Sequence, residues 1–209
     1  MSHPERFDPA LPEHAPGTKV YNYVAWRHEK ALPYVRDKTV LDIPCGVGWG
    51  TKMLMKTARM AFGVDRDGEA VCEAMRNFWD PNIIYLRGNM VKFPCPIGSP
   101  NDLGPPIFVD VVTCFEGYEH LDQEAQPCFL AEVKRVLKES GLLIMTVPVI
   151  KTNNPWHLHE PTKQELQDAL SRDFDILEFE NIEHHSVWVV AQLKRRQLPT
   201  SADPPPPQG

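Results

Sequence analysis

Apolar residues in this chain fall into two patterns, short continuous runs and stretches in which they recur every three or four positions. A continuous apolar run of about four to eight residues is typical of a buried strand, and a period near 3.6 is typical of a helix that covers it. The runs predict strands at 39–43, 60–64, 82–86, 109–114 and 142–147. The periodic stretches predict one or two helices at 18–35, then helices after residue 50, at 67–78, and before Gly141, which we expect to follow a helix end.

The pattern changes after residue 147. An irregular stretch is followed by a helix that opens at Pro161 and Thr162 and runs to about residue 171. Alternating segments at 174–182 and 186–193 predict a final hairpin. Strands that alternate with helices and end in a hairpin predict a doubly wound α/β fold, with helices on both faces of the sheet. In such folds the ligand lies across the carboxyl ends of the strands.

Proline content sets the expected limits of the domain. Residues 1–17 carry four prolines among charged residues, and we expect a flexible or draped N-terminal arm. Residues 196–209 include four consecutive prolines, so we expect a disordered proline-rich tail, or a segment that docks on a protein partner. The five prolines of 94–106 predict a surface loop where a helix usually lies. A single domain is therefore expected at 18–195.

Net charge and cysteine content narrow the class of protein. A formal net charge of −6 provides no basic surface for gripping a phosphate backbone, which disfavours nucleic acid as the main partner. The five cysteines are an odd number without C-x-x-C spacing, so neither a disulfide framework nor a zinc site is indicated. Reduced thiols predict a cytoplasmic location. No apolar run approaches the roughly 18 residues that a membrane span needs, so no membrane insertion is expected.

A glycine-rich turn follows the first expected strand. Gly46, Gly48 and Gly50 occupy alternate positions, and glycine lets a ligand approach bare backbone amides at a helix N-terminus. The spacing differs from the G-x-G-x-x-G of dinucleotide-binding proteins, which disfavours NAD. Asp42 lies inside an otherwise apolar strand, where a buried carboxylate indicates a function. Asp65 ends the next strand, at the place of a ribose-binding acid.

Five motifs, in order, resemble those of class I S-adenosylmethionine-dependent methyltransferases. They are Val-Leu-Asp-Ile-Pro-Cys-Gly-Val-Gly-Trp-Gly at 40–50, Gly-Val-Asp at 63–65, Gly-Asn-Met at 88–90, Asp-Val-Val-Thr-Cys-Phe-Glu at 110–116 with Glu-His-Leu at 119–121, and Arg-Val-Leu-Lys-Glu-Ser-Gly-Leu-Leu at 135–143. The resemblance covers 26–193. It implies a seven-stranded mixed sheet of order 3-2-1-4-5-7-6 with strand 7 antiparallel, and S-adenosylmethionine as cofactor.

The resemblance also implies how the methyl donor is bound. Asp42 and the turn from Cys45 to Gly50 would hold the methionine moiety, and Asp65 would accept hydrogen bonds from both ribose hydroxyls. Asn89 would read the adenine amino group with its side-chain oxygen, and Met90 would cover the adenine ring.

Two further donor contacts and three departures complete the comparison with the family. Cys114 and Phe115, at the end of the fourth expected strand, would lie beside the sulfonium. Asn89 stands where the family more often has aspartate, and His28 stands where tyrosine is usual. The proline-rich loop at 94–106 suggests an altered rim around the adenine.

The acceptor side is assigned from its position after the fifth expected strand, at the mouth of the cleft. His157 is the first candidate for a general base that takes the proton of a hydroxyl acceptor, followed by His120 and His159. Trp156 beside two histidines would form a wall for stacking a sugar. The spacing of His157, His159 and Glu160 is not that of a helical zinc motif, so no metal is expected. The expected acceptor contacts are Glu119, Trp156 and Glu160.

These assignments favour transfer of a methyl group from S-adenosylmethionine to a small-molecule or glycan acceptor at oxygen. Four stretches, at 27–28, 45–50, 115–121 and 154–160, are most similar to those of small methyltransferases of sugar, lipopolysaccharide or other surface-glycan pathways. One alternative is a non-catalytic cofactor-binding subunit or scaffold of a partner enzyme. As partners, a second copy of the chain in a homodimer, or a protein that binds the proline-rich tail, stay open. A nucleic-acid methyltransferase is disfavoured, because an Asn-Pro-Pro-Tyr motif should follow the fourth strand, where this chain has Phe-Glu-Gly-Tyr at 115–118.

Overall fold

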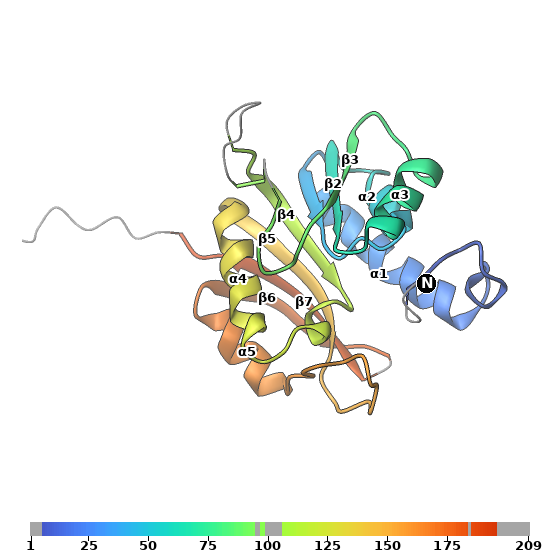
Figure 1. Ribbon diagram of the computed structural model, residues 1–209. Coiled ribbons are helices and arrows are strands. Elements are labelled where there is room, and N and C mark those ends of the chain that lie inside the picture. Colours follow the sequence, from blue (N-terminus) through green and yellow to red (C-terminus); the bar gives the residue numbers. More distant parts are fainter. Residues whose placement is uncertain (1–5, 95–96, 99–105, 184, 196–209) are drawn as a thin grey trace, which may run out of the picture.

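The computed structural model describes residues 6–94, 97–98, 106–183 and 185–195. These residues form a seven-stranded sheet of order β3-β2-β1-β4-β5-β7-β6 (Figure 1). β7 is antiparallel to both of its neighbours, and the other neighbouring strands are parallel. The predicted strand order and the antiparallel seventh strand are confirmed. The strands are β1 (Thr39–Asp42), β2 (Met60–Asp65), β3 (Ile83–Arg87), β4 (Val109–Phe115), β5 (Leu137–Pro148), β6 (Phe174–Asn181) and β7 (Ser186–Leu193).

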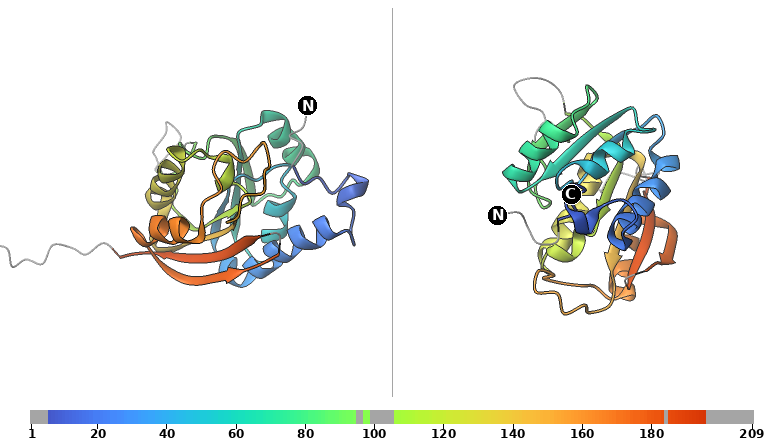
Figure 2. Two further views of the ribbon diagram at one scale, coloured as in Figure 1. Left: turned by 90° about the horizontal axis from the view of Figure 1, so that it is seen from below. Right: turned by 90° about the vertical axis from the view of Figure 1, so that its right-hand side faces the viewer.

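Helices cover both faces of this sheet (Figure 2). Residues of α4 and α5 share one buried apolar cluster with the sheet, whereas α1, α2 and α3 contribute to clusters on the opposite face. The described residues also form two short 3-10 helices, η1 and η2. The helices are α1 (Lys19–Val35), α2 (Trp49–Leu54), α3 (Gly68–Asn77), α4 (Ala125–Val136), α5 (Lys163–Ser171), η1 (Pro12–His14) and η2 (Tyr118–His120).

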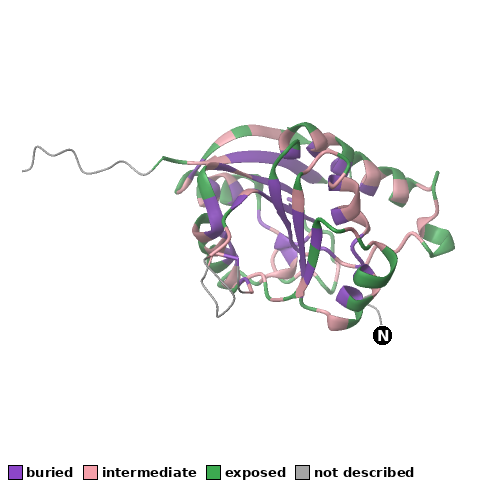
Figure 3. Cartoon of the chain, turned by 90° about the horizontal axis from the view of Figure 1, so that it is seen from above, coloured by how far each residue is buried: buried purple, intermediate pink, exposed green. Residues whose placement is uncertain are grey.

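The central strands are buried on both sides because successive side chains point to opposite faces. Leu41 of β1 packs in the cluster that includes α4 and α5, and its neighbour Val40 packs in the cluster that includes α1 and α2. Both side chains are fully buried, and Figure 3 shows the same for most of the central sheet. This explains why the strands appear in the sequence as continuous apolar runs.

The boundary between α4 and β5 differs from the sequence prediction. α4 ends at Val136, and β5 begins at once with Leu137, which pairs with Val109 of β4. Gly141 therefore lies inside β5 and follows no helix end, so that prediction is wrong. The positive φ of 60° in this stretch belongs to Ser140. The register of β4 and β5 shifts just after Val109, and the apolar periodicity of the sequence does not predict this irregularity.

The N-terminal arm lies against the domain over its described part, residues 6–17. The guanidinium of Arg6 contacts the Asp67 carboxylate at 2.5 Å, and the Phe7 ring packs on Trp49 at a centroid distance of 5.0 Å. The prediction of a flexible or draped arm at 1–17 stays a prediction. Residues 1–5, most of the loop at 94–106 and the proline-rich tail at 196–209 lie outside the described residues, so the predictions for them stay predictions.

Candidate active site

A cavity of about 1170 Å³ lies at the carboxyl ends of β1, β2 and β4. It extends from the glycine turn after β1 to the loop that follows β5. β1 is flanked by β2 on one side and by β4 on the other, so this is the point at which the doubly wound strand order reverses. Ligands of open α/β sheets bind at this point.

The three glycines of the turn serve different purposes. Gly46 has a φ of 54° and donates its backbone N–H to Asp65 Oδ2 at 2.9 Å. Gly48 has a φ of 85°, and it does not border the cavity. A Cβ on Gly50 would lie 2.1 Å from His28 Nε2, so Gly50 is required for the packing of α2 against α1. Burial lowers the pKa of His28 to about 3, which keeps its ring neutral.

Asp42 ends β1 with its carboxylate at the floor of the cavity, and only 3% of the residue is exposed. Thr51 donates its hydroxyl to Oδ2 at 2.6 Å, and Thr113 donates to Oδ1 at 2.8 Å. Burial raises the pKa of Asp42 to about 6, although the two hydroxyl hydrogen bonds oppose this shift. The carboxylate is therefore fixed in position, and a nearby positive charge would stabilise its ionised form.

Asp65 ends β2 on the other side of the turn. Backbone N–H groups of Gly46 and Asp67 each donate to one of its oxygens at 2.9 Å, which fixes the carboxylate plane. Asn89 and Met90 line the same end of the cavity. Asn89 Oδ1 already accepts the backbone N–H of Val91 at 3.0 Å, so any contact with an adenine amino group uses the second lone pair of this oxygen.

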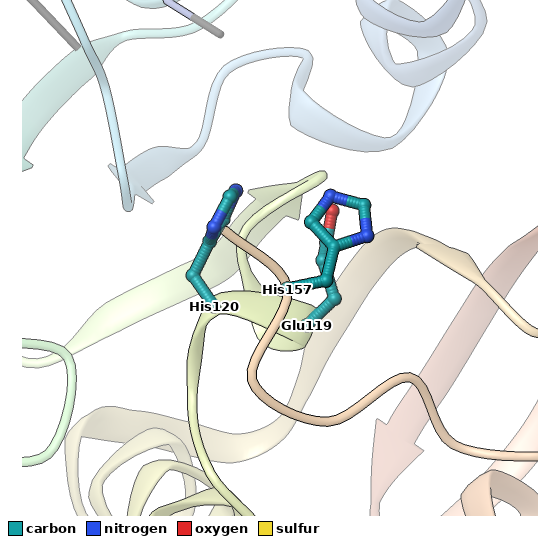
Figure 4. Close-up of side chains that lie close together, drawn as sticks. All are labelled: Glu119, His120 and His157. Carbon is teal, nitrogen blue, oxygen red and sulfur yellow. The ribbon is translucent and has the colours of Figure 1, made fainter. Parts of the chain in front are cut away.

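At the opposite end of the cavity, η2 and the loop after β5 bring Glu119, His120 and His157 together (Figure 4). One ligand-type atom from each side chain lies within 4.8 Å of the others. The two histidine rings are 5.2 Å apart at an interplanar angle of 86°. His120 Nδ1 lies 3.1 Å from the Trp156 carbonyl oxygen. His157 Nδ1 lies 2.5 Å from Glu160 Oε1.

Main-chain hydrogen bonds tie the loop to η2. The Glu119 carbonyl accepts the N–H groups of Leu158 and His159 at 2.9 and 3.2 Å. The buried Gln126 amide donates to the carbonyls of Tyr118 and His159 at 3.2 and 2.8 Å. Desolvation alone would raise the pKa of Glu160, but hydrogen bonds from Thr152 and His157 lower it below its usual range. This end of the cavity is thus preorganised by hydrogen bonds between η2 and the loop after β5.

The structure brings most of the predicted site residues to this cavity. Four of them do not border it: Gly48 and Cys114, which are buried, and His159 and Glu160, which are half-buried. Glu160 still contacts the site through His157. The residues that line the cavity are Asp42, Cys45, Gly46, Gly50, Asp65, Asn89, Met90, Phe115, Glu119, His120, Trp156 and His157.

Three arginines that line the cavity, Arg6, Arg27 and Arg66, are absent from the sequence-based assignment of the site. Arg27 is 9% exposed, lies on the apolar face of α1, and has no hydrogen-bond partner for its Nε among the described residues. Its guanidinium carbon lies 5.7 Å from the Phe115 ring centroid. Arg6 reaches the cavity from the N-terminal arm. A charged residue on an apolar helix face is a signal that identifies Arg27 from sequence, whereas Arg6 has no such signal.

Comparison with known proteins places this chain in a family. A family model described as a methyltransferase domain matches residues 40–141. A probable S-adenosylmethionine-dependent methyltransferase of Mycobacterium tuberculosis is 30% identical over 167 residues, which cover 74% of this chain and 56% of that protein. The chain belongs to the class I S-adenosylmethionine-dependent methyltransferases. The cofactor of this family is S-adenosylmethionine, as predicted.

Further relatives fit the same methyltransferase assignment. The phthiotriol/phenolphthiotriol dimycocerosates methyltransferase 1 of Mycobacterium ulcerans is 31% identical over 116 residues, which cover 52% of this chain and 37% of that protein. This chain therefore spans little more than half the length of the first mycobacterial relative, and less of the second.

Solved structures agree on the methyltransferase fold. A Pyrococcus horikoshii protein superposes with a TM-score of 0.69 at 19% identity, covering 88% of this chain and 97% of that chain. The N-methyltransferase NodS of Bradyrhizobium japonicum, solved with S-adenosyl-L-homocysteine, gives a TM-score of 0.68 at 13% identity, covering 89% and 92%. Among the described residues, the helices are all too short or too polar to cross a membrane.

Proposed function

We propose that this protein transfers a methyl group from S-adenosylmethionine to a hydroxyl oxygen of a small-molecule or glycan acceptor. The observation that carries the proposal is the continuous cavity, which joins a donor end at the glycine turn to an acceptor end at the histidine loop. A volume of about 1170 Å³ exceeds the roughly 300 to 1,000 Å³ of most single-ligand sites. Donor and acceptor therefore have room to bind together.

The donor end provides a partner for each part of S-adenosylmethionine. The Asp42 carboxylate would attract the ammonium group, and Asp65 would accept hydrogen bonds from the two ribose hydroxyls. Asn89 and Met90 would contact the adenine. The sulfonium would lie between the turn and Phe115, and the thiols of Cys45 and Cys114 would contribute only packing, because burial raises their pKa well above the usual range.

Arg27 completes this arrangement with a partner for the donor's carboxylate group. Its guanidinium is buried at the cavity wall near Asp42, and a guanidinium binds a carboxylate in a bidentate manner. The adjacent positive and negative side chains match the zwitterionic end of the methionine moiety. Each charge of that moiety would therefore meet its opposite inside the cavity.

Methyl transfer itself needs alignment more than chemical activation. A lone pair of the acceptor oxygen forms a bond to the methyl carbon while the carbon–sulfur bond breaks. The electron pair of that bond stays on sulfur, which leaves S-adenosylhomocysteine. The hydroxyl proton must leave the oxygen, and His157 and His120 are the side chains at the acceptor end that can receive it. His159, predicted as a third candidate, does not line the cavity.

Trp156 supports a sugar-like or extended acceptor. The residue is 48% exposed and lines the cavity next to the two histidines. An exposed aromatic face beside polar groups is suited to stacking on a sugar ring. The M. ulcerans relative is named for a triol, which is a hydroxyl-bearing compound, and this agrees with transfer to oxygen.

Calorimetric titration with S-adenosylmethionine tests the donor assignment. We expect saturable binding by the wild-type chain, and at least roughly tenfold weaker binding by Asp65→Ala and by Arg27→Met, because each removes a charge-assisted contact with the donor. Asp175→Ala, which removes an exposed carboxylate of β6, is the matched control and should bind as the wild type does.

The titration also separates the alternatives. Absence of binding by the folded wild-type chain would overturn the proposed function. Binding without turnover on a panel of sugars and lipid alcohols would favour a non-catalytic subunit. Unchanged affinity in Asp65→Ala or Arg27→Met would show that the assignment of that contact is wrong.

A further inference from the structure

We propose that Glu119, His120 and His157 bind a divalent transition-metal ion at the acceptor end of the cavity. The three side chains come from two segments, η2 and the loop after β5, and they meet where the acceptor would lie. Figure 4 shows the two imidazole rings beside the Glu119 carboxylate. The spacing of His157, His159 and Glu160 disfavours a metal, but the structure assembles a different set of three.

The distances suit a site that closes around an ion. One candidate ligand atom from each residue lies within 4.8 Å of the others. Ligands bound to one ion at about 2.1 Å are roughly 3 to 3.5 Å apart, so small side-chain rotations bring the three atoms into range. Asn154 Nδ2 lies 3.1 Å from His157 Nε2, and an ion bound to that nitrogen would displace this amide.

A hydrogen-bond partner at Nδ1 orients each histidine ring, as is usual for histidines that bind a metal ion. His120 Nδ1 lies 3.1 Å from the Trp156 carbonyl, and His157 Nδ1 lies 2.5 Å from Glu160 Oε1. A histidine that donates one ring N–H to a carbonyl or carboxylate presents the lone pair of its other nitrogen, Nε2 here. Metal-bound histidines nearly always have such a partner, because it fixes the ring and raises its basicity.

The Glu119 carboxylate and the hydrogen bonds around Glu119 also favour a metal site. Glu119 is fully buried and lines the cavity, and a carboxylate oxygen beside two imidazole nitrogens is a usual ligand set for a transition-metal ion. Its own backbone carbonyl anchors the loop that carries His157, through the N–H groups of Leu158 and His159. Gln126 then ties the loop to η2 by a second route. The ligand set is therefore positioned before any ion arrives.

Two imidazole nitrogens and one carboxylate oxygen favour ions between Mn²⁺ and Zn²⁺ over Mg²⁺ or Ca²⁺, which prefer oxygen ligands alone. Three protein ligands leave positions open for another molecule. Resting on the proposed methyl transfer, the ion would bind the acceptor oxygen and lower the pKa of its hydroxyl. His120 and His157 would then hold the ion, and the acceptor's proton would pass to solvent.

Titration of the chelator-treated full chain with Co²⁺ tests this proposal, because the visible absorption of Co²⁺ changes when nitrogen ligands bind. We expect saturation at one ion per chain. His120→Ala and Glu119→Gln should each weaken Co²⁺ binding by roughly tenfold or more. Zn²⁺ should displace Co²⁺, since affinity in such sites increases from Co²⁺ to Zn²⁺.

His185→Asn is the matched control, because it removes a histidine from the exposed β6–β7 turn, and asparagine tolerates the φ of 61° found there. It should leave Co²⁺ binding unchanged. Absence of saturable Co²⁺ binding by the wild type, or equal affinity in His120→Ala, would overturn the metal site.

Titration of each variant with S-adenosylmethionine, followed without metal, shows that its donor end is folded. This titration also distinguishes the metal-site proposal from the methyl-transfer proposal. Donor binding without Co²⁺ binding would reject only the metal site, and Co²⁺ binding without donor binding would reject only the methyl-transfer proposal.

Discussion

At the scale of single residues, the site consists of charges placed in the interior at a cost in stability. Asp42 is the clearest case, since its carboxylate is buried under the cavity floor and held by two threonine hydroxyls. The strand pattern identifies this residue from sequence, because a carboxylate interrupts an apolar run. The two threonines are found only in the folded chain, nine and 71 residues away. We expect Asp42 to lower the folding stability of the ligand-free protein and to strengthen binding of the methyl donor.

Asp42→Asn should stabilise the ligand-free protein at neutral pH. The folded state raises the pKa of Asp42 from 3.8 to about 6, so the folded chain binds this proton more tightly than the unfolded chain. Folding stability therefore falls as pH rises from about 4 to 6, and the loss persists above pH 6. The difference corresponds to at most roughly 3 kcal/mol, which Asn avoids. Thermal melts from pH 4 to 8 should show the variant's advantage only above about pH 5.

The same variant should bind S-adenosylmethionine at least roughly tenfold more weakly at pH 7.5, because the ammonium group loses its counter-charge. Asp175→Asn, an exposed carboxylate on β6, should change neither property. A variant that is less stable than the wild type at pH 7.5 would contradict this account of Asp42.

At the scale of elements, the sequence predicts which helices and strands exist better than where they end. Apolar periodicity located every strand, and Thr162 caps α5 as expected from its position. Gly141 led to a wrong prediction of the boundary between α4 and β5. The segment before Gly141 is strand instead of a helix end, because Leu137 pairs with Val109 of β4 directly after α4. The residue preferences of a local turn carry no information about pairing with a strand that is distant in sequence.

The N-terminal arm is the element whose functional role the sequence does not reveal. Phe7 packs on Tyr21 and Trp49, and this places Arg6 beside the glycine turn and inside the cavity wall. We expect Phe7→Ala to weaken S-adenosylmethionine binding several-fold in calorimetry, because the arm loses its anchor and uncovers the donor. Leu11→Ala, an exposed arm residue outside the cavity, is the control and should bind normally. Equal affinities in the two variants would show that the arm does not cover the donor.

At the scale of the whole molecule, the cavity joins the two halves of the sheet. The end that we propose for the donor is formed by the ends of β1 and β2, and the end that we propose for the acceptor is formed by segments after β4 and β5. A ligand that spans the switch point contacts both halves, so its binding free energy adds to the stability of the whole domain.

S-adenosylmethionine at about one hundred times its dissociation constant should stabilise the folded chain by about 2.7 kcal/mol. For a chain of this length, the midpoint of thermal unfolding should rise by roughly 5 to 10 °C. S-adenosylhomocysteine should act similarly, since it retains the groups that contact the donor end. NAD should have no effect, because the turn lacks the dinucleotide spacing. A comparable shift with NAD, or none with S-adenosylmethionine, would contradict the cofactor assignment in differential scanning fluorimetry.

The sequence by itself determined the succession of strands and helices through its apolar periodicity. Its resemblance to the methyltransferase family, carried by motifs such as the turn at 40–50, implied the strand order and the class of methyl donor. The parts of each motif are neighbours along the chain. Only the tertiary structure decided that Gly50 is needed to admit His28, that Arg6 and Arg27 line the cavity, and that Glu119, His120 and His157 form a cluster. The physical reason is that such contacts depend on packing between distant segments, which leaves no periodic or spacing signal in the chain.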